Sequence, residues 1–392
     1  MNHVEALMEP AADAPRSGAA GLSSWLEVDR GAFEGNLRAL AAVLGGQTEA
    51  CLVLKADAYG HGLDLLMPSV LRASPAAVAV TDNAEARTVR ACGFRGRLLR
   101  LRVAGPDEVA EGFPYDLEEL LGSLDNARDL SALATRQGRT LRYHLALNSG
   151  GMSREGLDLA AGAGEEALAI LRLPRLEVAG IMTHFPVRAQ DDMGRGFRRF
   201  RDDSAWVLER GRLDRRRITL HCANSYATLN VPEARMDMVR CGGILYRPLD
   251  PASAARHGFR SIAQFKSRVG SINAYPAGNT VSYDRTFTLP RPSRLASVPV
   301  GYSDGFRCRA DDQRAVLVRG RRLAVVGKGT MNTIMVDVTD HPDIRPGDEV
   351  VLFGRQGGEA ITLDAFARSL GCPTWEEMAT SVGNQNPRVR VD

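Results

Sequence analysis

The chain has 392 residues, of which 44% are hydrophobic and 25% charged, the composition of an ordinary globular protein. Its 50 basic and 47 acidic residues leave a net charge of +3 with no long run of one sign, so a nucleic acid or a membrane surface has no electrostatic support as a partner. No apolar stretch approaches the roughly 18 residues that a membrane-spanning helix needs. The length predicts two domains, or one large domain with an appendage.

Residues 1–23 contain Pro, Ala and acidic side chains but lack the basic and apolar regions of a signal peptide, so they are interpreted as a flexible leader. We therefore expect the protein in the cytoplasm, or in the periplasm if a signal peptide was removed. Six dispersed cysteines without a C-x-x-C pair predict neither a disulfide framework nor a metal site. A single disulfide between Cys51 and Cys92 remains an open alternative.

Between residues 24 and 255, short apolar runs alternate with amphipathic stretches of helix length, a pattern typical of repeated βα units. Seven strands are predicted, at 51–54, 77–80, 98–101, 142–147, 178–183, 218–221 and 238–245. Helices are predicted at 32–43, 83–91, 117–137, 164–171 and 197–210. We predict a (β/α)₈ barrel with one strand unrecognised, and a doubly wound sheet is the alternative. Polar, reactive side chains follow nearly every strand, which favours the barrel.

After residue 256 helices nearly vanish, and short β-rich runs are separated by Gly and Pro. Strands are predicted at 262–272, 280–287, 296–301, 315–318, 323–326, 333–338 and 349–353. The predicted fold class is therefore α/β, with an N-terminal (β/α)₈ TIM-type barrel at 24–255 and a C-terminal, mainly-β domain at 256–392.

The densest chemical segment is KADAYGHG at 55–62, directly after the first strong strand. Lys55 is one of only three lysines among the 50 basic residues. At the C-terminal end of a barrel strand, a partly desolvated lysine amine can be neutral enough to form a covalent bond with a carbonyl group. An arbitrary strand-end lysine is more often merely solvated, but the Asp, Tyr and Gly-His-Gly around Lys55 favour a functional role.

From this segment onward the chain resembles the alanine racemase family of pyridoxal phosphate enzymes, over roughly residues 24–390. The motifs that carry the resemblance are KADAYGHG (55–62), HLALNSGGMSREG (144–156), THF (183–185), HCANS (221–225), RCGGILY (240–246), SYDRTF (282–287), GYSDGFR (301–307) and MNTIMVDVT (331–339). ALNSGGMSR, MNT and the tail GNxNPRV are most similar to the broad-specificity amino-acid racemase branch. The resemblance implies pyridoxal 5'-phosphate as cofactor, an amino acid as substrate and a homodimer with shared active sites.

The resemblance also implies the catalytic pair. Racemisation needs a base on each face of the substrate α-carbon, because the proton leaves one side and returns on the other. Lys55, which would hold the cofactor covalently, would act on the D face. Tyr283 of the partner subunit would act on the L face. Without the resemblance, Tyr283 would be interpreted as a packing residue of a hairpin.

The remaining implied site residues surround the cofactor and the substrate. Arg240 would face the pyridine nitrogen and, because a guanidinium only donates hydrogen bonds, would keep that nitrogen unprotonated and suppress side reactions. Arg154, Met331 and Asn332 would bind the substrate, and His221 would support the network. No metal is expected. The cofactor-binding set is Lys55, Tyr59, Arg154, His184, Ser225, Arg240, Gly242 and Gly243.

Several departures from the family pattern bear on substrate choice. Arg247 stands where the family usually has Gly, Glu155 follows Arg154, and the tail at 381–384 lacks the tyrosine of strict alanine racemases. Ala146 stands where many strict alanine racemases have a lysine, and Asn148 and Asn332 stand where they have acidic residues, so we expect a less acidic and roomier site. A racemase specialised on one D-amino acid for a natural product is therefore an alternative. A pyridoxal phosphate-dependent decarboxylase or a non-catalytic carrier is less favoured, because the motifs of the first are missing and the second would lack the β domain.

Overall fold

The computed structural model describes residues 18–151, 155–307 and 314–391. These residues form two compact units. The first, which we call the barrel unit, comprises Gly31–Tyr59 and Leu66–Ile262. The second, which we call the β unit, comprises residues 18–30, 60–65 and 263–391 of the described chain.

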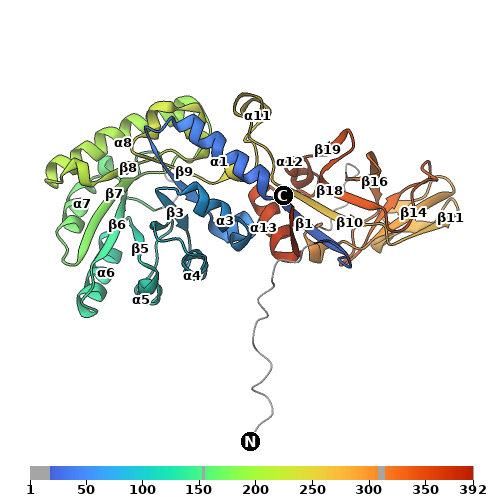
Figure 1. The fold of residues 1–392 in the computed structure, drawn as a ribbon, viewed down its shortest axis with the longest axis horizontal. Coiled ribbons are helices and arrows are strands. Elements are labelled where there is room, and N and C mark those ends of the chain that lie inside the picture. The colour runs from blue at the N-terminus through green and yellow to red at the C-terminus, as the bar shows by residue number, and fades with distance from the viewer. Residues whose placement is uncertain (1–17, 152–154, 308–313, 392) are drawn as a thin grey trace, which may run out of the picture. The chain divides into compact units, whose positions relative to one another are not determined.

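Eight parallel strands form the sheet of the barrel unit, in the order β8-β7-β6-β5-β4-β3-β2-β9 (Figure 1). Each strand pairs in parallel with the next along this order, which confirms the predicted barrel. The strands are β2 (Glu49–Val53), β3 (Ala77–Val80), β4 (Arg97–Arg100), β5 (Leu117–Leu121), β6 (Leu141–Ala146), β7 (Leu176–Met182), β8 (Thr219–His221) and β9 (Met238–Cys241).

The seam between β8 and β9 is closed by individual hydrogen bonds instead of a continuous β-ladder. The Arg240 amide donates to the Ala223 carbonyl at 2.9 Å, and the Asp237 amide donates to the Leu220 carbonyl at 3.2 Å. An isolated parallel bridge joins Asn224 to Arg240. The barrel is therefore nearly closed, with its C-terminal strand ends at one rim.

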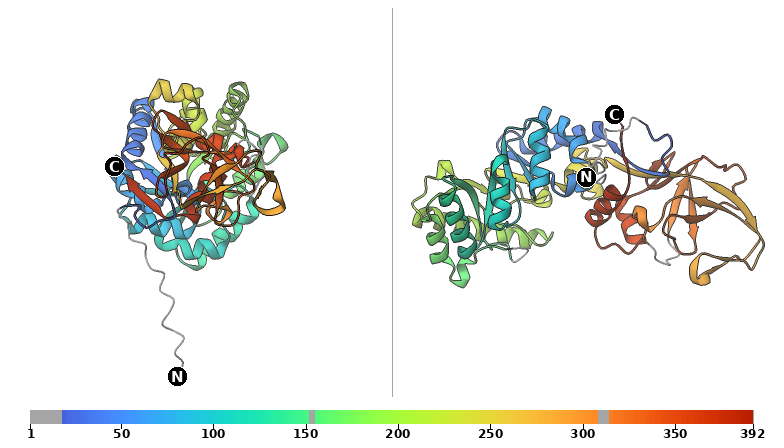
Figure 2. Two further views of the ribbon diagram at one scale, coloured as in Figure 1. Left: turned by 90° about the vertical axis from the view of Figure 1, so that its right-hand side faces the viewer. Right: turned by 90° about the horizontal axis from the view of Figure 1, so that it is seen from below.

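Helices flank the strands of the barrel unit from outside (Figures 1 and 2). Capping side chains begin several of them. Asp82 accepts from the Glu85 amide at the start of α4, and Asn224 accepts from two amides at the start of α9. The helices are α1 (Arg30–Leu44), α3 (Leu63–Ala73), α4 (Asn83–Ala91), α5 (Pro106–Gly112), α6 (Leu124–Arg136), α7 (Gly164–Leu171), α8 (Gln190–Arg210), α9 (Ser225–Asn230), α10 (Gly243–Tyr246) and α11 (Pro251–His257).

The eighth strand lies where a helix over 117–137 was predicted, and that prediction is wrong over 117–123. Residues 117–121 form β5, and α6 begins only after its cap, Ser123. All five residues of β5 are buried. Glu118 and Glu119 point to opposite faces of the strand, where each pairs with an arginine of β4. Two adjacent glutamates look like the polar face of a helix unless these partners are known.

The Cys51–Cys92 disulfide, which the sequence left as an open alternative, is not formed in the structure. Cys51 is fully buried on β2 and carries a free thiol. Burial, the largest effect, raises the pKa of this thiol to about 12, so it stays protonated. The cysteine fills part of an apolar cluster inside the barrel with Val53, Ala79 and Leu99.

The β unit is built on a ten-stranded sheet whose main path is β11-β14-β17-β16-β15-β18-β10-β1-β20, with β19 paired to β18 (Figures 1 and 2). The predicted mainly-β domain is confirmed. Two helices, α12 (Leu363–Ser369) and α13 (Trp375–Gln385), lie where helices were expected to be nearly absent. Besides β1 (Ser24–Asp29), the strands of this sheet are β10 (Ala263–Arg268), β11 (Ser271–Tyr275), β14 (Ser293–Val298), β15 (Ala315–Val318), β16 (Arg321–Val326), β17 (Ile334–Asp337), β18 (Glu349–Gln356), β19 (Glu359–Ile361) and β20 (Arg388–Val391). A separate two-stranded sheet consists of β12 (Thr280–Val281) and β13 (Phe287–Thr288).

The first strand of the described chain, β1 (Ser24–Asp29), belongs to this second sheet. It pairs antiparallel with β10 and parallel with β20. The buried Lys266 of β10 is paired, because its ammonium nitrogen contacts Glu27 of β1 at 2.8 Å and Glu349 at 3.1 Å. The N-terminal and C-terminal strands therefore hold the β unit together, although the sequence placed residues from 24 onward with the barrel.

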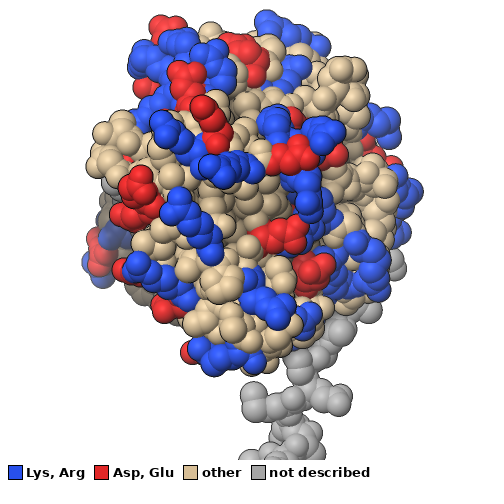
Figure 3. Space-filling model, turned by 90° about the vertical axis from the view of Figure 1, so that its left-hand side faces the viewer, with Lys and Arg blue, Asp and Glu red and all other residues tan. Residues whose placement is uncertain are grey.

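Charges of both signs alternate on the surface. On the face that Figure 3 shows, at the side of α7 and α8 in Figure 1, basic and acidic side chains are interspersed. Along α8, Arg195 pairs with Asp192, and Arg199 pairs with Asp203. Within the described ranges, no helix has the length and apolar character needed to cross a membrane.

Asn36 of α1 links three backbone groups inside the barrel unit. Its amide donates to the carbonyls of Leu245 and Arg260, and its carbonyl accepts from the Arg260 amide. Asn36→Ala should leave these buried groups unpaired and lower the free energy of unfolding by about 2–4 kcal/mol. Urea unfolding measures this loss. The exposed Asn384 is the control, and equal stability of N36A and N384A would contradict the assignment.

Candidate active site

Lys55 begins a left-handed turn at the end of β2. The next four residues, Ala56, Asp57, Ala58 and Tyr59, have φ values of 53°, 52°, 53° and 56°. None of them is glycine, and a left-handed conformation costs such residues about 1–2 kcal/mol each. Consecutive strain of this kind persists only where the surroundings impose it, and it is concentrated at functional sites.

The turn is held by one hydrogen bond of its own and by bonds to two neighbouring elements, β3 and α4. The Leu54 amide donates to the Ala79 carbonyl of β3 at 2.8 Å, and the Ala58 amide donates to the Leu54 carbonyl at 2.8 Å. Glu85 of α4 accepts from the Asp57 amide at 3.0 Å through one carboxylate oxygen and from the Thr81 amide at 2.8 Å through the other. This nearly buried carboxylate therefore ties the turn to the end of β3.

Tyr59, at the end of the turn, lies against the loop that follows β9. A Cβ atom on Gly242 would come within 2.6 Å of the Tyr59 hydroxyl, so only glycine allows this approach. The Ser225 hydroxyl, at the start of α9, accepts from the Gly242 amide at 3.1 Å. Gly243 follows in the same loop and begins α10. Two hydroxyls and adjacent backbone amides thus converge, which is the donor set that binds phosphate groups.

The Lys55 ammonium nitrogen lies 6.0 Å from the centre of the Tyr59 ring. The ring also packs on Tyr246, with ring centres 4.9 Å apart, and the Tyr246 hydroxyl donates to the Val53 carbonyl at 3.0 Å. The structure therefore brings together the predicted residues Lys55, Tyr59, Ser225, Gly242 and Gly243 at one rim of the barrel.

Arg240 forms a second centre at the same rim, and it is 4% exposed. Its guanidinium donates to the Thr183 carbonyl at 2.8 Å and to the His221 carbonyl at 3.0 Å. The guanidinium also lies 2.9 Å from the Nδ1 of His221 and 3.3 Å from the Nδ1 of His184. The structure thus groups three further predicted residues, and the contacts to carbonyl groups orient the guanidinium.

Behind Arg240 the barrel interior holds ionisable side chains, of which the sequence did not reveal Glu118. His221 bonds to His144 of β6, and His144 bonds to Glu118 of β5. Burial lowers the pKa of both histidines, and for His221 the neighbouring His144 and Arg240 add to the effect. Burial opposes ionisation of Glu118, but hydrogen bonds from His144 and Arg97 outweigh it and lower its pKa to about 2. His144 stood in a recognised motif, whereas Glu118 was assigned to a helix.

Three predicted residues lie in loops of the β unit. The side chain of Tyr283 is 69% exposed, and that of Met331 is 52% exposed. Asn332 donates to the Ser303 hydroxyl at 2.8 Å, and this hydroxyl donates to the Met331 carbonyl at 2.8 Å. Arg154 lies outside the described residues, so its predicted contacts stay a prediction. Arg247 is 8% exposed and directly follows α10.

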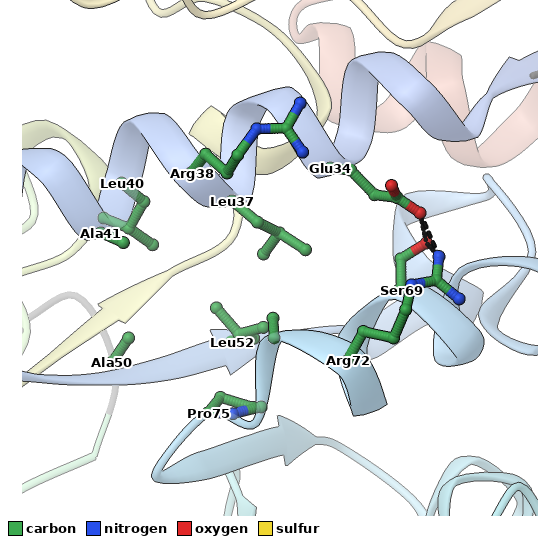
Figure 4. A pocket seen from close by; sticks show the side chains of 11 residues that line it. Glu34, Leu37, Arg38, Leu40, Ala41, Ala50, Leu52, Ser69, Arg72 and Pro75 are labelled. Atoms are coloured by element: carbon green, nitrogen blue, oxygen red, sulfur yellow. Dashed lines mark hydrogen bonds and ion pairs between the residues drawn. The ribbon is translucent and has the colours of Figure 1, made fainter.

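A separate cavity of about 330 Å³ opens on the outer flank of the barrel unit, between α1, α3 and β2 (Figure 4). Its floor is apolar, with Leu37, Leu40 and Leu52, and Glu34 at its edge bonds to Ser69. None of the predicted site residues lines it. The candidate active site therefore lies at the strand ends and not in this cavity.

Comparison with known proteins agrees with this geometry. Residues 28–249 match the model of the alanine racemase N-terminal domain, and residues 262–390 match that of the C-terminal domain. The chain belongs to the alanine racemase family.

Two curated members of the alanine racemase family resemble this chain along most of its length. A broad specificity amino-acid racemase of Pseudomonas putida is 50% identical over 371 residues, covering 94% of this chain and 90% of the relative. A lysine racemase of Proteus mirabilis is 44% identical with the same coverage. The fold also matches a crystal structure of alanine racemase from Bartonella henselae with covalently bound pyridoxal phosphate, at 23% identity and a TM-score of 0.82, covering 94% of this chain and 99% of that one.

The strained turn of this alanine racemase family member should depend on Glu85. Glu85→Leu removes the acceptor for the Asp57 and Thr81 amides, so we expect a loss of about 2–3 kcal/mol in the free energy of unfolding. Binding of added pyridoxal phosphate, followed by absorbance, should weaken as well. Glu111, an exposed glutamate of α5, is the control. An E85L variant as stable and as readily loaded as E111L would refute the role of Glu85.

Proposed function

We propose that this protein is a pyridoxal phosphate-dependent amino-acid racemase of broad specificity, an isomerase that interconverts L- and D-amino acids, alanine included. The observation that carries the proposal is the 50% identity, across 94% of the chain, to a broad specificity amino-acid racemase. The group of Lys55, Tyr59, Arg240 and His184 at one barrel rim agrees with it.

The residues at the rim fit pyridoxal phosphate. Lys55 would hold the cofactor covalently, and the hydroxyls of Tyr59 and Ser225 with the amides of Gly242 and Gly243 would bind its phosphate. The space that a Cβ on Gly242 would fill, beside the Tyr59 hydroxyl, supports this assignment. Arg240 and His184 would lie along the pyridine ring, and Arg154 would reach its phenolic oxygen. When bound, the cofactor withdraws electrons from an attached amino acid and makes its α-hydrogen acidic.

Two side chains would move the proton. The Lys55 amine would remove or return the α-proton on the D face, and the Tyr283 hydroxyl would do so on the L face. A free tyrosine titrates at a pKa of about 10, so Tyr283 needs neighbouring donors or cations to act near neutrality. Met331 and Asn332 would receive the substrate carboxylate and fix the α-carbon between the two bases.

The exposed loops of the β unit support a homodimer in which Tyr283 and Met331 serve the partner's site. Large apolar side chains at 69% and 52% exposure are unusual unless a partner covers them. Their loops are tied together, because Lys328 pairs with Asp284 at 2.5 Å and the Ser282 hydroxyl donates to the Lys328 carbonyl. Such a preformed surface suits a second copy of this chain.

A racemase specialised on one amino acid is the second candidate. One relative at 44% identity is a lysine racemase, so specificity differs among similar chains. The buried Arg247, where the family usually has Gly, and the exposed Glu155 change the charge beside the cofactor residues.

Solvent deuterium exchange separates the two candidates. Each L- and D-amino acid is incubated with cofactor-loaded protein in D₂O, and mass spectrometry and chiral analysis follow the α-carbon. Broad specificity predicts exchange with inversion for many side chains, including basic ones and alanine. Exchange with one amino acid alone would support the specialised enzyme. Lys55→Ala is the inactive reference, and exchange by no amino acid with wild-type protein would refute both.

Tyr283→Phe tests the second base. The variant should load cofactor normally but lose roughly 100-fold or more in racemisation rate in both directions, because proton delivery to one face is lost. Tyr275→Phe, a tyrosine of β11 in the same unit, should be unchanged. Normal turnover of Y283F in chiral assays would show that another group acts on that face.

A further inference from the structure

The buried chain of Glu118, His144, His221 and Arg240 crosses the barrel interior from β5 to β9. The His144 Nε2 lies 2.8 Å from a Glu118 oxygen, and the His144 Nδ1 lies 2.7 Å from the His221 Nε2. The His221 Nδ1 lies 2.9 Å from Arg240. The four side chains are between 0% and 4% exposed. Barrel interiors are usually filled by branched apolar side chains, so a polar chain of this length needs an explanation.

The two ends of this chain fix where every proton sits. Arg240 has only donors, so the His221 Nδ1 must accept, and the single proton of a neutral His221 lies on Nε2. That proton is donated to the Nδ1 of His144, whose own proton then lies on Nε2 and is donated to Glu118. The carboxylate accepts at the far end. A protonated His144 would reverse one bond and place two donors face to face at Arg240.

The charges around the chain agree with this order. Glu118 accepts from Arg97 at 3.0 Å and pairs with Arg142 at 2.7 Å, so its ionised form is compensated. Burial lowers the pKa of both histidines and outweighs the opposing effect of Glu118 on His144, which favours their neutral forms. Arg240 of β9 and Arg97 of β4 are the other charged groups that act on them. The hydrogen-bonded series from Glu118 to Arg240 is a fixed arrangement and not a proton wire, because an arginine does not release its proton near neutrality.

The backbone makes room for His144. The register between β6 and β7 shifts between Tyr143 and His144, an irregularity that re-aims a side chain. Opposite, a Cβ on Gly180 of β7 would lie 2.3 Å from the His144 Nδ1. A bulge and a glycine at the same place show that the barrel accommodates the ring in this orientation.

We propose that Glu118 and His144 are positioning residues for Arg240. Through His221 they present a lone pair to the guanidinium and hold it in the orientation that also satisfies the Thr183 carbonyl. This inference deepens the proposed function, since Arg240 is the residue assigned to the cofactor ring. Glu118 acts from the opposite side of the barrel interior, two histidines away.

The proton order is tested directly by nitrogen NMR of the full-length protein labelled at histidine. The chain has seven histidines, and His144→Gln and His221→Gln assign the two signals. We expect both rings to be neutral and protonated on Nε2 alone at pH 7. A proton on Nδ1 of either ring, or a charged ring, would overturn the inference without any variant of Glu118.

Three variants then separate positioning from stability. Glu118→Leu removes the acceptor of the His144 Nε2 proton. His144, and through it His221, should then populate the other neutral form, and racemisation should fall roughly tenfold. Glu118→Gln keeps an acceptor oxygen and should retain both the signals and most of the activity. Glu119→Leu is the matched control, because Glu119 is the next residue of β5, equally buried and paired with Arg100 at 2.8 Å on the other face.

Each outcome decides a separate question. E119L should lose stability but leave the histidine signals unchanged. If E118L and E119L change these signals equally, Glu118 has only a structural role. If E118L does not fold, the wild-type spectrum and E118Q decide. Expected histidine signals in a protein that racemises no amino acid would keep the positioning inference and refute the proposed function.

Discussion

The barrel and its site both depend on the hydrogen bonds that Arg240 makes. The sheet has no ladder between β8 and β9, and the guanidinium of Arg240 lies at this seam. It donates to the Thr183 carbonyl just after β7 and to the His221 carbonyl at the end of β8, while the backbone amide of Arg240 donates to the Ala223 carbonyl. A guanidinium supplies five donors and no acceptor, so it can satisfy several carbonyls that a closed ladder would have paired. The residue at this seam is thus also the one that we propose for the cofactor ring.

The site combines strain with fixed charge. Four left-handed residues after Lys55 would be too costly for an isolated chain, and Glu85 and β3 supply the bonds that hold them. Inside the barrel, Glu118 is compensated by Arg97 and Arg142. The turn after Lys55 and the side chain of Arg240 are therefore both held in place before any ligand binds. This preorganisation lowers the free-energy cost of orienting a ligand at the rim.

The sequence predicted the barrel because strands and helices alternate with distinct periodicities, and the boundaries of β3, α4 and α7 agree with the structure. It did not reveal β5, because Glu118 and Glu119 are charged residues inside a buried strand. Each pairs there with an arginine on the neighbouring strand, about 20 residues earlier in the chain, and Glu118 also pairs with Arg142 and His144. The pairing of β1 with β10 and β20 was hidden for the same reason, since sheet partners far apart in sequence leave no local pattern.

By itself the sequence determined the repeating βα pattern, the mainly-β second half and the motifs that identify the family. These are local properties, set by side-chain periodicity and by short runs such as KADAYGHG. Only the tertiary structure decided that Glu118 meets His144 and that His221 meets Arg240. Hydrogen bonds inside a closed barrel depend on which strands become neighbours and on how each side chain is aimed. A bulge at His144 and the missing Cβ of Gly180 set that aim, and neither can be read from spacing along the chain.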